Sequence, residues 1–411
     1  MKANKVLSAI LAAGMIFSLA ACDFGGSTDS ESDKTSASEK TEDYIKLNME
    51  YNGAEVSVIA EPFLKYLSAE TEEDAIKILK EYEKTAIVQN FLIKWESDGS
   101  SQYVVRLADN EEMTGASVFV TNRTICNLGG TLIPDKTYYY QVIGEAKESR
   151  VDSFKVGGTV RPITADGADN VRDLGGWKMD GGSIPYGLIY RGGKINDGTK
   201  CALKDSGLKT MRETLGIKTE IDLRFADIDD GGQKTSVLGD DVNYVKAGYH
   251  GYNYILPEFS HYGENDRSYY KASADSIKRI FTALADENNY PVYFHCNAGA
   301  DRTGTLAILI EVLLGVSEAD ITRDFELTTF SSYGARYRGK IENGRFAGGV
   351  MQDDSNNFVA FGYFIERIKA VYCKDGETLG QGVEKYLKEV CSVTDEEISS
   401  IRKILTKRKE E

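Results

Sequence analysis

The sequence predicts an α/β domain with a mostly parallel central sheet flanked by helices, preceded by an all-β sandwich domain. Two observations support this prediction. Between residues 46 and 158, short runs of β-branched and aromatic residues alternate with turn residues at regular spacing. From residue 159 to 411, apolar strand-like runs alternate with segments of helical periodicity, as in a parallel sheet covered by helices. The composition, 41% hydrophobic and 27% charged, is ordinary for a globular protein.

The first residues indicate export. A lysine-containing start precedes an apolar run over residues 6–21, which is short for a membrane-spanning helix of about 20 residues. The run ends in Leu-Ala-Ala-Cys at residues 19–22, which resembles the bacterial lipobox, whose cysteine is acylated and becomes the N-terminus. We therefore expect residues 1–22 to be a lipoprotein signal peptide and Cys22 to anchor the protein outside the bacterial cell membrane. An ordinary signal peptide cut after Ala21, or an uncleaved anchor, is the alternative.

The segment after this signal is expected to be a flexible tether. Residues 23–45 are dominated by Ser, Thr, Gly and charged residues, which bury little apolar surface. The net charge of −15 argues against a nucleic-acid partner, and any anion site must be built locally against that charge. No CxxC pair or Cys/His cluster occurs, so we expect neither a metal nor another cofactor. Beyond Cys22 five cysteines remain, and their odd number leaves at least one free thiol.

Residues 46–158 contain the predicted sandwich. Strand-like runs occupy residues 91–95, 102–107 and 137–143, and a helix with a capping-box pattern interrupts them at residues 71–82. Trp95 and the tyrosines at 138–140 resemble the fibronectin type III module, which implies a spacer or interaction role with an unknown partner. An unrelated small all-β domain is the alternative.

The elements expected in residues 159–411 alternate in type. Strands are predicted at 187–191, 219–223, 242–246 and 291–294, and helices at 202–215, 273–287 and 305–314, followed by a helical C-terminal part. The last helix begins with a capping box at Thr394 and Glu397.

The loop after the strand at 291–294 has the chemistry of an anion site. Residues 295–304 read His-Cys-Asn-Ala-Gly-Ala-Asp-Arg-Thr-Gly, between an apolar strand and an apolar helix. Ligands of α/β sheets bind at this edge, where the amides of a helix N-terminus favour an anion. Arg302 adds a bidentate clamp, and Cys296 is placed where a thiol pKa can fall to roughly 3.5–7.5. We expect a thiolate nucleophile that forms a thiophosphoryl intermediate. The expected phosphate-binding residues are Asn297, Ala298, Gly299, Ala300, Asp301, Arg302 and Thr303.

This loop resembles the signature of the cysteine-dependent protein tyrosine phosphatases, in which five residues separate Cys from an Arg followed by Ser or Thr. With residues 170–176, 189–193, 217–224 and 324–328, it resembles the bacterial and fungal tyrosine/serine phosphatases from about Arg161 to the C-terminus. The resemblance implies a fold like that of dual-specificity phosphatases and activity on phosphotyrosine, sometimes on phosphoserine/threonine or phosphoinositides. The family's loop lysine is Ala300 here, which disfavours multiply phosphorylated inositol lipids.

The resemblance also implies roles for the loop residues. Cys296 is the nucleophile, Arg302 the phosphate clamp, and Thr303 a hydrogen-bond donor to the thiolate. His295 orients the loop or is simply a packed strand-end histidine.

The leaving-group acid stays open at this point. Asp301 is the first candidate, because phosphatases with Asp before the loop Arg use it so, although it could be a structural brace. Asp222, at the end of a neighbouring strand, is second, and Asp266, in a polar loop, is third.

Other residues have two interpretations each. Asn170, Arg172 and Asp173 shape the rim of the site or form an internal Arg–Asp contact at a glycine turn. The tyrosines at 269–270 and 333–337 line a pocket for an aromatic ester or pack in the interior.

Three functions remain after the sequence is read. The first is a protein-tyrosine or dual-specificity phosphatase that acts on a phosphorylated protein or small phosphoester. The second is an inositol polyphosphate or phosphoinositide phosphatase. The third is an inert surface binding protein.

Overall fold

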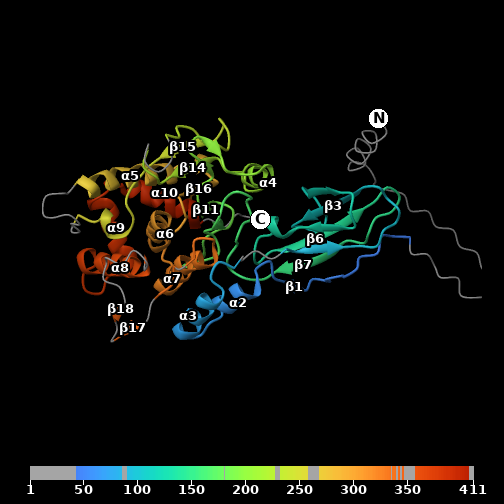
Figure 1. Cartoon of the computed structure of the whole chain (residues 1–411), viewed down its shortest axis with the longest axis horizontal. Coiled ribbons are helices and arrows are strands. Elements are labelled where there is room, and N and C mark those ends of the chain that lie inside the picture. The colour runs from blue at the N-terminus through green and yellow to red at the C-terminus, as the bar shows by residue number, and fades with distance from the viewer. Residues whose placement is uncertain are drawn as a thin grey trace, which may run out of the picture. The chain divides into compact units, whose positions relative to one another are not determined.

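The computed structural model describes residues 43–85, 90–179, 181–226, 232–257, 268–334, 336–338, 341–342, 345–346 and 357–406 (Figure 1). The predicted signal peptide, Cys22, nearly all of the tether and Asp266 lie outside these ranges. Residues 43–411 form one compact unit. Within the described ranges, no helix combines the length and the apolar character that crossing a membrane requires.

The N-terminal part is built on a five-stranded sheet. The strand order is β1 (Glu55–Val56), β7 (Asp152–Val156), β6 (Thr137–Ile143), β3 (Tyr103–Ala108) and β4 (Ser117–Thr121). All neighbours are antiparallel except β1 and β7. A separate antiparallel pair joins β2 (Leu92–Lys94) to β5 (Ile125–Asn127). Side chains alternate inward and outward along β6, and the inward Tyr138, Tyr140 and Val142 are buried, as expected for a sheet with one covered face.

Two helices accompany this sheet. The predicted helix at residues 71–82 is confirmed as α3 (Glu72–Glu81), where the Thr71 side chain accepts a hydrogen bond from the Asp74 amide at 3.1 Å. Helix α2 (Glu61–Leu67) was not predicted. It has only seven residues and no side-chain cap, so its helical periodicity is too short to recognise.

The second sheet confirms the predicted mostly parallel arrangement. Its order is β15 (Asn243–Lys246), β14 (Thr219–Asp222), β16 (Val292–His295), β11 (Ile189–Gly192) and β8 (Arg172–Asp173). The first four strands are parallel, and β8 runs antiparallel to β11. The central strand β16 and its two neighbours β14 and β11 are buried along their whole length, and β16 is apolar from Val292 to Phe294.

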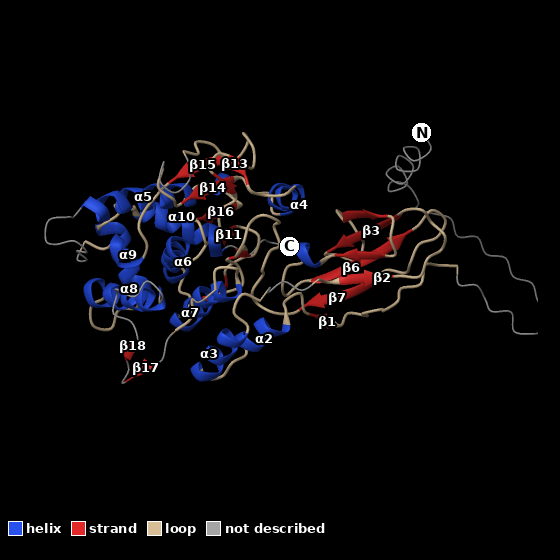
Figure 2. Ribbon diagram, in the orientation of Figure 1, coloured by secondary structure: helices blue, strands red, loops and turns tan. Residues whose placement is uncertain are grey.

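Helices pack around this sheet (Figure 2). They are α4 (Asp205–Lys209, continuing as a π-helical turn at Thr210–Thr214), α5 (Ser268–Leu284), α6 (Asp301–Leu313), α7 (Glu318–Glu326), α8 (Asn357–Tyr372), α9 (Leu379–Glu389) and α10 (Asp395–Thr406). The remaining short strands form three antiparallel pairs: β9 (Lys178–Met179) with β10 (Gly182–Ser183), β12 (Asn196–Asp197) with β13 (Lys200–Cys201), and β17 (Ile341–Glu342) with β18 (Arg345–Phe346).

Helix α6 is the central helix of the molecule. Every residue from Thr303 to Leu313 is buried, which matches its apolar sequence on all sides. It follows the loop after β16 directly, so the loop is held between the central strand and the central helix.

A single hydrophobic cluster extends from Ile45 to Leu405 and joins the N-terminal part to the α/β part. A smaller cluster lies around Ile195, Met211 and Tyr293. Residues on both sides of the loop after β16 therefore belong to these hydrophobic clusters.

Candidate active site

Cys296 lies at the carboxyl edge of the parallel sheet, immediately after β16. Its residue is 3% exposed, at the base of a loop that runs to Ala300 before α6 begins at Asp301. The parallel neighbours β14 and β11 end beside the same edge, because Asp222 and Gly192 are both in register with His295. This is the edge at which α/β proteins bind their ligands.

Gly299 lets the loop approach strand β11 closely. Its φ is +68°, and a Cβ atom there would lie 2.4 Å from the carbonyl carbon of Gly192. Only glycine combines this left-handed backbone with so little space.

Side chains from outside the loop hold two of its carbonyl groups. The Asn170 side-chain amide donates to the carbonyl oxygens of Ala298 and Gly299, each at 3.1 Å, and to the Thr328 hydroxyl at 3.1 Å. Arg191 also donates to the Gly299 carbonyl oxygen, at 3.0 Å. These two carbonyl groups are thereby turned towards their donors and away from the loop's interior.

The Asn297 carbonyl is held in the same way. It accepts from the Lys194 backbone amide and from the Tyr333 hydroxyl, each at 3.1 Å. Among the described residues, none accepts a hydrogen bond from the backbone amides of residues 297–301. These amides and the N-terminus of α6 form a set of donors suited to an oxyanion.

A buried ionic cluster lies beneath the loop. Arg172 binds the Asp324 carboxylate at 2.8 Å and the Asn170 side-chain oxygen at 2.6 Å, and Arg191 also pairs with Asp324. Burial raises the pKa of Asp324, but the charges of Arg172 and Arg191 outweigh it, so that the pKa is lowered. Arg172 is thus an internal brace of the loop rather than a residue of the rim, and its acidic partner is Asp324.

Asp173 belongs to a separate buried pair. Its carboxylate lies 3.2 Å from Arg161 and also accepts from the backbone amides of Gly175 and Gly187, each at 2.9 Å. The contact between Arg172 and Asp173 that the sequence suggested does not occur, because the two side chains alternate across strand β8.

Asp301 begins α6 and is held from two sides. Its Oδ1 atom accepts from the Tyr252 hydroxyl at 2.8 Å and from Arg336 Nε at 3.1 Å, whereas Oδ2 has one longer contact, with Arg336 Nη2 at 3.4 Å. Its side chain is 36% exposed. Burial, and then the charge of Asp301, raise the pKa of Tyr252 well above its usual value, so Tyr252 remains a hydrogen-bond donor.

The next two loop residues differ in exposure. Arg302 is half-buried, and its carbonyl accepts from the Tyr249 hydroxyl. The pKa of Tyr249 is raised well above its usual value by burial and then by its proximity to Cys296. The Thr303 hydroxyl is buried and has no partner among the described residues. A buried hydroxyl of this kind is available to donate a hydrogen bond to a nearby anion.

His295 is completely buried at the end of β16. Its Nε2 atom lies 2.9 Å from Glu220, its Nδ1 atom lies 3.3 Å from the Cys296 carbonyl oxygen, and its ring stacks on Tyr293. These contacts fix the ring, and with it the start of the Cys296 loop.

Asp222 is buried among cations. It lies 2.7 Å from Arg224 and 3.0 Å from Lys246, and it accepts from the Tyr244 hydroxyl at 2.9 Å. Burial raises the pKa of Asp222, but His295, Arg224 and Lys246 outweigh it and hold the pKa well below its usual range. Asp222 is therefore a permanent carboxylate and is unsuited to donate a proton near neutral pH.

Glu220, Asp222 and His295 are the one group among the described residues whose ligand atoms lie close enough to hold a metal ion, within 4.8 Å of one another. Asp222 is already neutralised by two cations, and Glu220 is bound by His295 and Ser236. The donor set fits an internal ionic network better than a metal site.

Two of the tyrosines singled out from the sequence differ in position. Tyr333 is 40% exposed and reaches the Asn297 carbonyl, so it stands at the mouth of the loop. Tyr337 packs against the main core and is not part of the mouth. The side chain of Tyr269 lies outside the described residues.

Comparisons with known proteins identify the family of this chain. The sequence profile described as "Tyrosine phosphatase family" matches residues 163–407. A tyrosine-protein phosphatase of Nostoc commune is 30% identical over 120 residues, which is 28% of this chain and 41% of that protein. A Cupriavidus necator protein, provisionally named as a tyrosine-protein phosphatase, is 28% identical over 178 residues, which is 40% of this chain and 61% of that protein. The chain thus spans about half the length of the curated relatives it matches.

A solved structure is also similar. The core catalytic domain of the yeast PP-IP phosphatase SIW14, in complex with citrate, is 16% identical, with a TM-score of 0.23 over 36% of this chain and 78% of that chain. The family profile covers more than half of the 411 residues and includes the whole Cys296 loop. The chain belongs to the tyrosine phosphatase family.

Proposed function

We propose that this protein is a cysteine-dependent phosphomonoesterase that prefers phosphotyrosine. The observation that supports it best is the loop geometry at Cys296: three successive carbonyl groups are held by outside donors, and the amides beside the thiol are left for an anion. A preorganised set of donors of this kind stabilises the charge that develops on a transferring phosphoryl group.

The reaction has two steps. The Cys296 thiolate attacks phosphorus, the bond between phosphorus and the ester oxygen breaks, and that oxygen leaves with a proton from Asp301. Water then attacks the thiophosphoryl group, Asp301 takes the water's proton, and the S–P bond breaks to release phosphate and restore the thiolate. Arg302 binds the phosphoryl oxygens throughout, and the Thr303 hydroxyl donates to the departing thiolate.

Asp301 is a better candidate for the proton donor than Asp222. The Asp301 carboxyl is partly exposed beside the loop, and its Oδ2 atom has only one long contact. Asp222 is held as a carboxylate by Arg224 and Lys246. A proton carrier must reach the leaving oxygen and exchange protons with water, and a positioned acid of this kind contributes about 10²–10⁴-fold to the rate.

The preference for an aromatic ester is supported by Tyr333, whose exposed ring stands at the mouth of the loop. The alternative, an inositol polyphosphate or phosphoinositide, would call for cations at that mouth. Ala300, which stands where the family has lysine, is completely buried and offers none.

The proposal extends to the parts of the chain outside the catalytic region. Residues 1–22 are a lipoprotein signal, Cys22 carries the lipid, and residues 23–45 tether the enzyme to the outer side of a bacterial membrane. Residues 46–158 are a module like fibronectin type III, and residues 159–411 are the catalytic domain. The support for the module is the five-stranded sheet with its inward tyrosines, together with the buried Trp95, which follows β2 outside that sheet.

The test is phosphate release under reducing conditions from a phosphotyrosine peptide, a phosphoserine peptide, a phosphoinositide and phytate. Wild type should act best on the phosphotyrosine peptide, and Cys296→Ser should be inactive. Cys201→Ser, which removes an exposed thiol elsewhere, is the matched control and should retain full activity. Activity that survives Cys296→Ser would refute the mechanism, and preference for phytate would favour the inositol alternative.

A further inference from the structure

The segment that follows α7 returns to the Cys296 loop and contacts Asp301. The guanidinium of Arg336 places Nε 3.1 Å from Asp301 Oδ1 and Nη2 3.4 Å from Oδ2. The Arg336 backbone amide donates to the Thr329 hydroxyl at 3.1 Å. Arg336 therefore reaches Asp301 from a backbone that is itself fixed.

Two residues further on, Arg338 is clamped by a buried carboxylate. Its backbone amide and Nε donate to Glu326 Oε1 at 2.8 and 2.9 Å, and its Nη2 donates to Oε2 at 3.0 Å. Glu326 is completely buried, and its Oε2 also accepts from the Tyr66 hydroxyl at 2.7 Å. Because Tyr66 belongs to α2, the N-terminal part of the chain contacts the carboxylate that holds Arg338.

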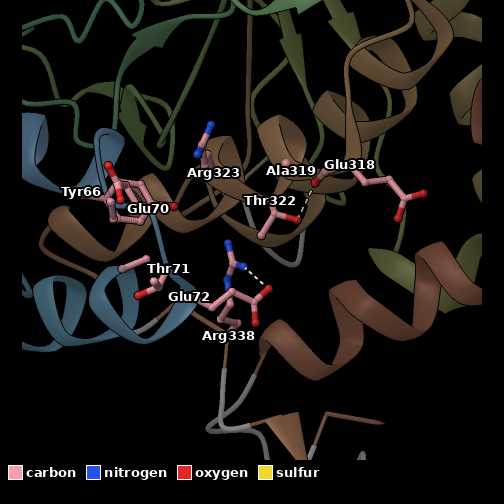
Figure 3. A pocket seen from close by; sticks show the side chains of 11 residues that line it. Tyr66, Glu70, Thr71, Glu72, Glu318, Ala319, Thr322, Arg323 and Arg338 are labelled. Atoms are coloured by element: carbon pink, nitrogen blue, oxygen red, sulfur yellow. Dashed lines mark hydrogen bonds and ion pairs between the residues drawn. The ribbon is translucent and has the colours of Figure 1, made fainter. Parts of the chain in front are cut away.

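Helix α3 supplies another contact to the same arginine. Arg338 Nη1 lies 2.8 Å from Glu72, in the first turn of α3 (Figure 3). The two residues lie beside a pocket of about 400 Å³ between α2 and α3 on one side and α7 on the other. Both residues line the pocket, and the dashed line between them in Figure 3 marks their ion pair.

The start of the segment is held by the same helices. The rings of Phe63 and Tyr66 pack on Phe330 with centroids 5.3 and 5.9 Å apart. The Lys84 amide, just after α3, donates to the Thr329 carbonyl at 3.0 Å. Residues on both sides of Arg336 are therefore attached to α2 and α3.

These contacts orient the Asp301 carboxyl. Tyr252 and Arg336 Nε converge on Oδ1, whereas Oδ2 has, among the described residues, only the 3.4 Å contact with Arg336 Nη2, so Oδ2 is the oxygen better placed to carry a proton. We propose that Arg336 is a positioning residue for Asp301, and that α2 and α3, through Tyr66, hold the segment that carries it. The inference rests on the proposed function, in which Asp301 protonates the leaving oxygen.

The experiment compares two esters on the same preparations of the full chain. Phenyl phosphate has a poor leaving group that needs a proton, whereas an aryl phosphate with a strongly acidic phenol leaves without one. For Arg336→Met we expect kcat/KM, which reports only the steps up to loss of the phenol, to fall about tenfold on phenyl phosphate, within the range of general-acid contributions, and less than about twofold on the activated ester. Arg336→Lys should restore part of the loss, because its ammonium still reaches a carboxylate.

The role of the N-terminal helices is tested with Tyr66→Phe, which removes only the hydroxyl that donates a hydrogen bond to Glu326. It should show the same selective loss on phenyl phosphate, about threefold, or near 0.7 kcal/mol. Lys65→Met is the matched control, because Lys65 is the neighbouring residue on α2 and its pair with Glu61 is exposed.

Partial unfolding lowers both rates equally, so it cannot imitate the selective loss. An equal fall on both esters, or no fall on either, would refute the positioning role of Arg336; the same result for Tyr66→Phe alone would refute the role of the helices. An inactive wild type, or an active Cys296→Ser, would instead refute the proposed function.

Discussion

Asn170 offers a sharp test of how the Cys296 loop is held. Its side chain donates to the Ala298 and Gly299 carbonyls and to Thr328, and accepts from Arg172. Its backbone has φ +58°, which Asn tolerates better than Ala. In Asn170→Ala, the Ala298 carbonyl loses this donor, and the buried Arg172 loses its shortest contact.

The loss of folding stability in Asn170→Ala can be estimated from these contacts. A buried carbonyl left without its donor costs about 1–3 kcal/mol, and a lost hydrogen bond to a charged group costs about 1.5–3 kcal/mol. The left-handed backbone adds about 1 kcal/mol for Ala. We therefore expect Asn170→Ala to lower the free energy of unfolding by about 3.5–7 kcal/mol, and Asn170→Gly to lower it by about 1 kcal/mol less.

Two measurements check this prediction. Urea denaturation gives the free energy of unfolding, and inhibition by inorganic phosphate reports the anion site. We expect the inhibition constant to rise about tenfold, which corresponds to 1.4 kcal/mol, because the loop amides are no longer held in place.

Asn52→Ala is the control for the backbone term. Asn52 also has a left-handed backbone, with φ +50°, but it is exposed and far along the chain from the loop. If Asn170→Ala were no more destabilising than Asn52→Ala, and phosphate inhibition were unchanged, Asn170 would not hold the Cys296 loop.

Two further predictions concern buried carboxyls and pH. Burial, with the charge of Asp324, raises the pKa of Glu311 well above its usual value, so the folded protein holds a proton that the unfolded chain releases above about pH 4.3. Glu311→Gln should therefore become more stable relative to wild type as the pH rises from 5 to 8, with the free energy of unfolding measured by urea denaturation. If the free energy of unfolding of Glu311→Gln fell relative to that of wild type as the pH rose, this prediction would be wrong. Asp222→Asn breaks a buried contact with Arg224 and Lys246 and should cost about 3–5 kcal/mol. Because the folded pKa of Asp222 is depressed, that deficit should be constant from pH 5 to 8 and shrink only below about pH 3.9, while the ratio of rates on the two esters stays at its wild-type value.

The local part of the site could be predicted from the sequence. The strand, the Cys296 loop and α6 follow one another along the chain, and each has its own signal: an apolar run, closely spaced glycines and a second apolar run. Because these elements are contiguous, the sequence indicates their geometry without knowledge of the fold.

The supports of the loop could not be predicted in the same way. Arg191 and Arg172 meet Asp324 from 133 and 152 residues away, and no local pattern indicates which acid an arginine will find. Arg172 makes the internal Arg–Asp contact that was one of its two interpretations, but its partner is Asp324 rather than the neighbouring Asp173. Arg336 was not predicted as a site residue, because only the tyrosines of residues 333–337 had been singled out from the sequence.

The core shared between the two halves of the chain has an evolutionary consequence. Modules that are shuffled among genes carry surfaces that need no particular neighbour. Here Phe63 and Tyr66 complete the packing of Phe330, and Glu72 pairs with Arg338. Recombination that exchanged residues 46–158 for another module would strip the remaining chain of these partners. The two halves are therefore expected to be inherited together and to diverge in step.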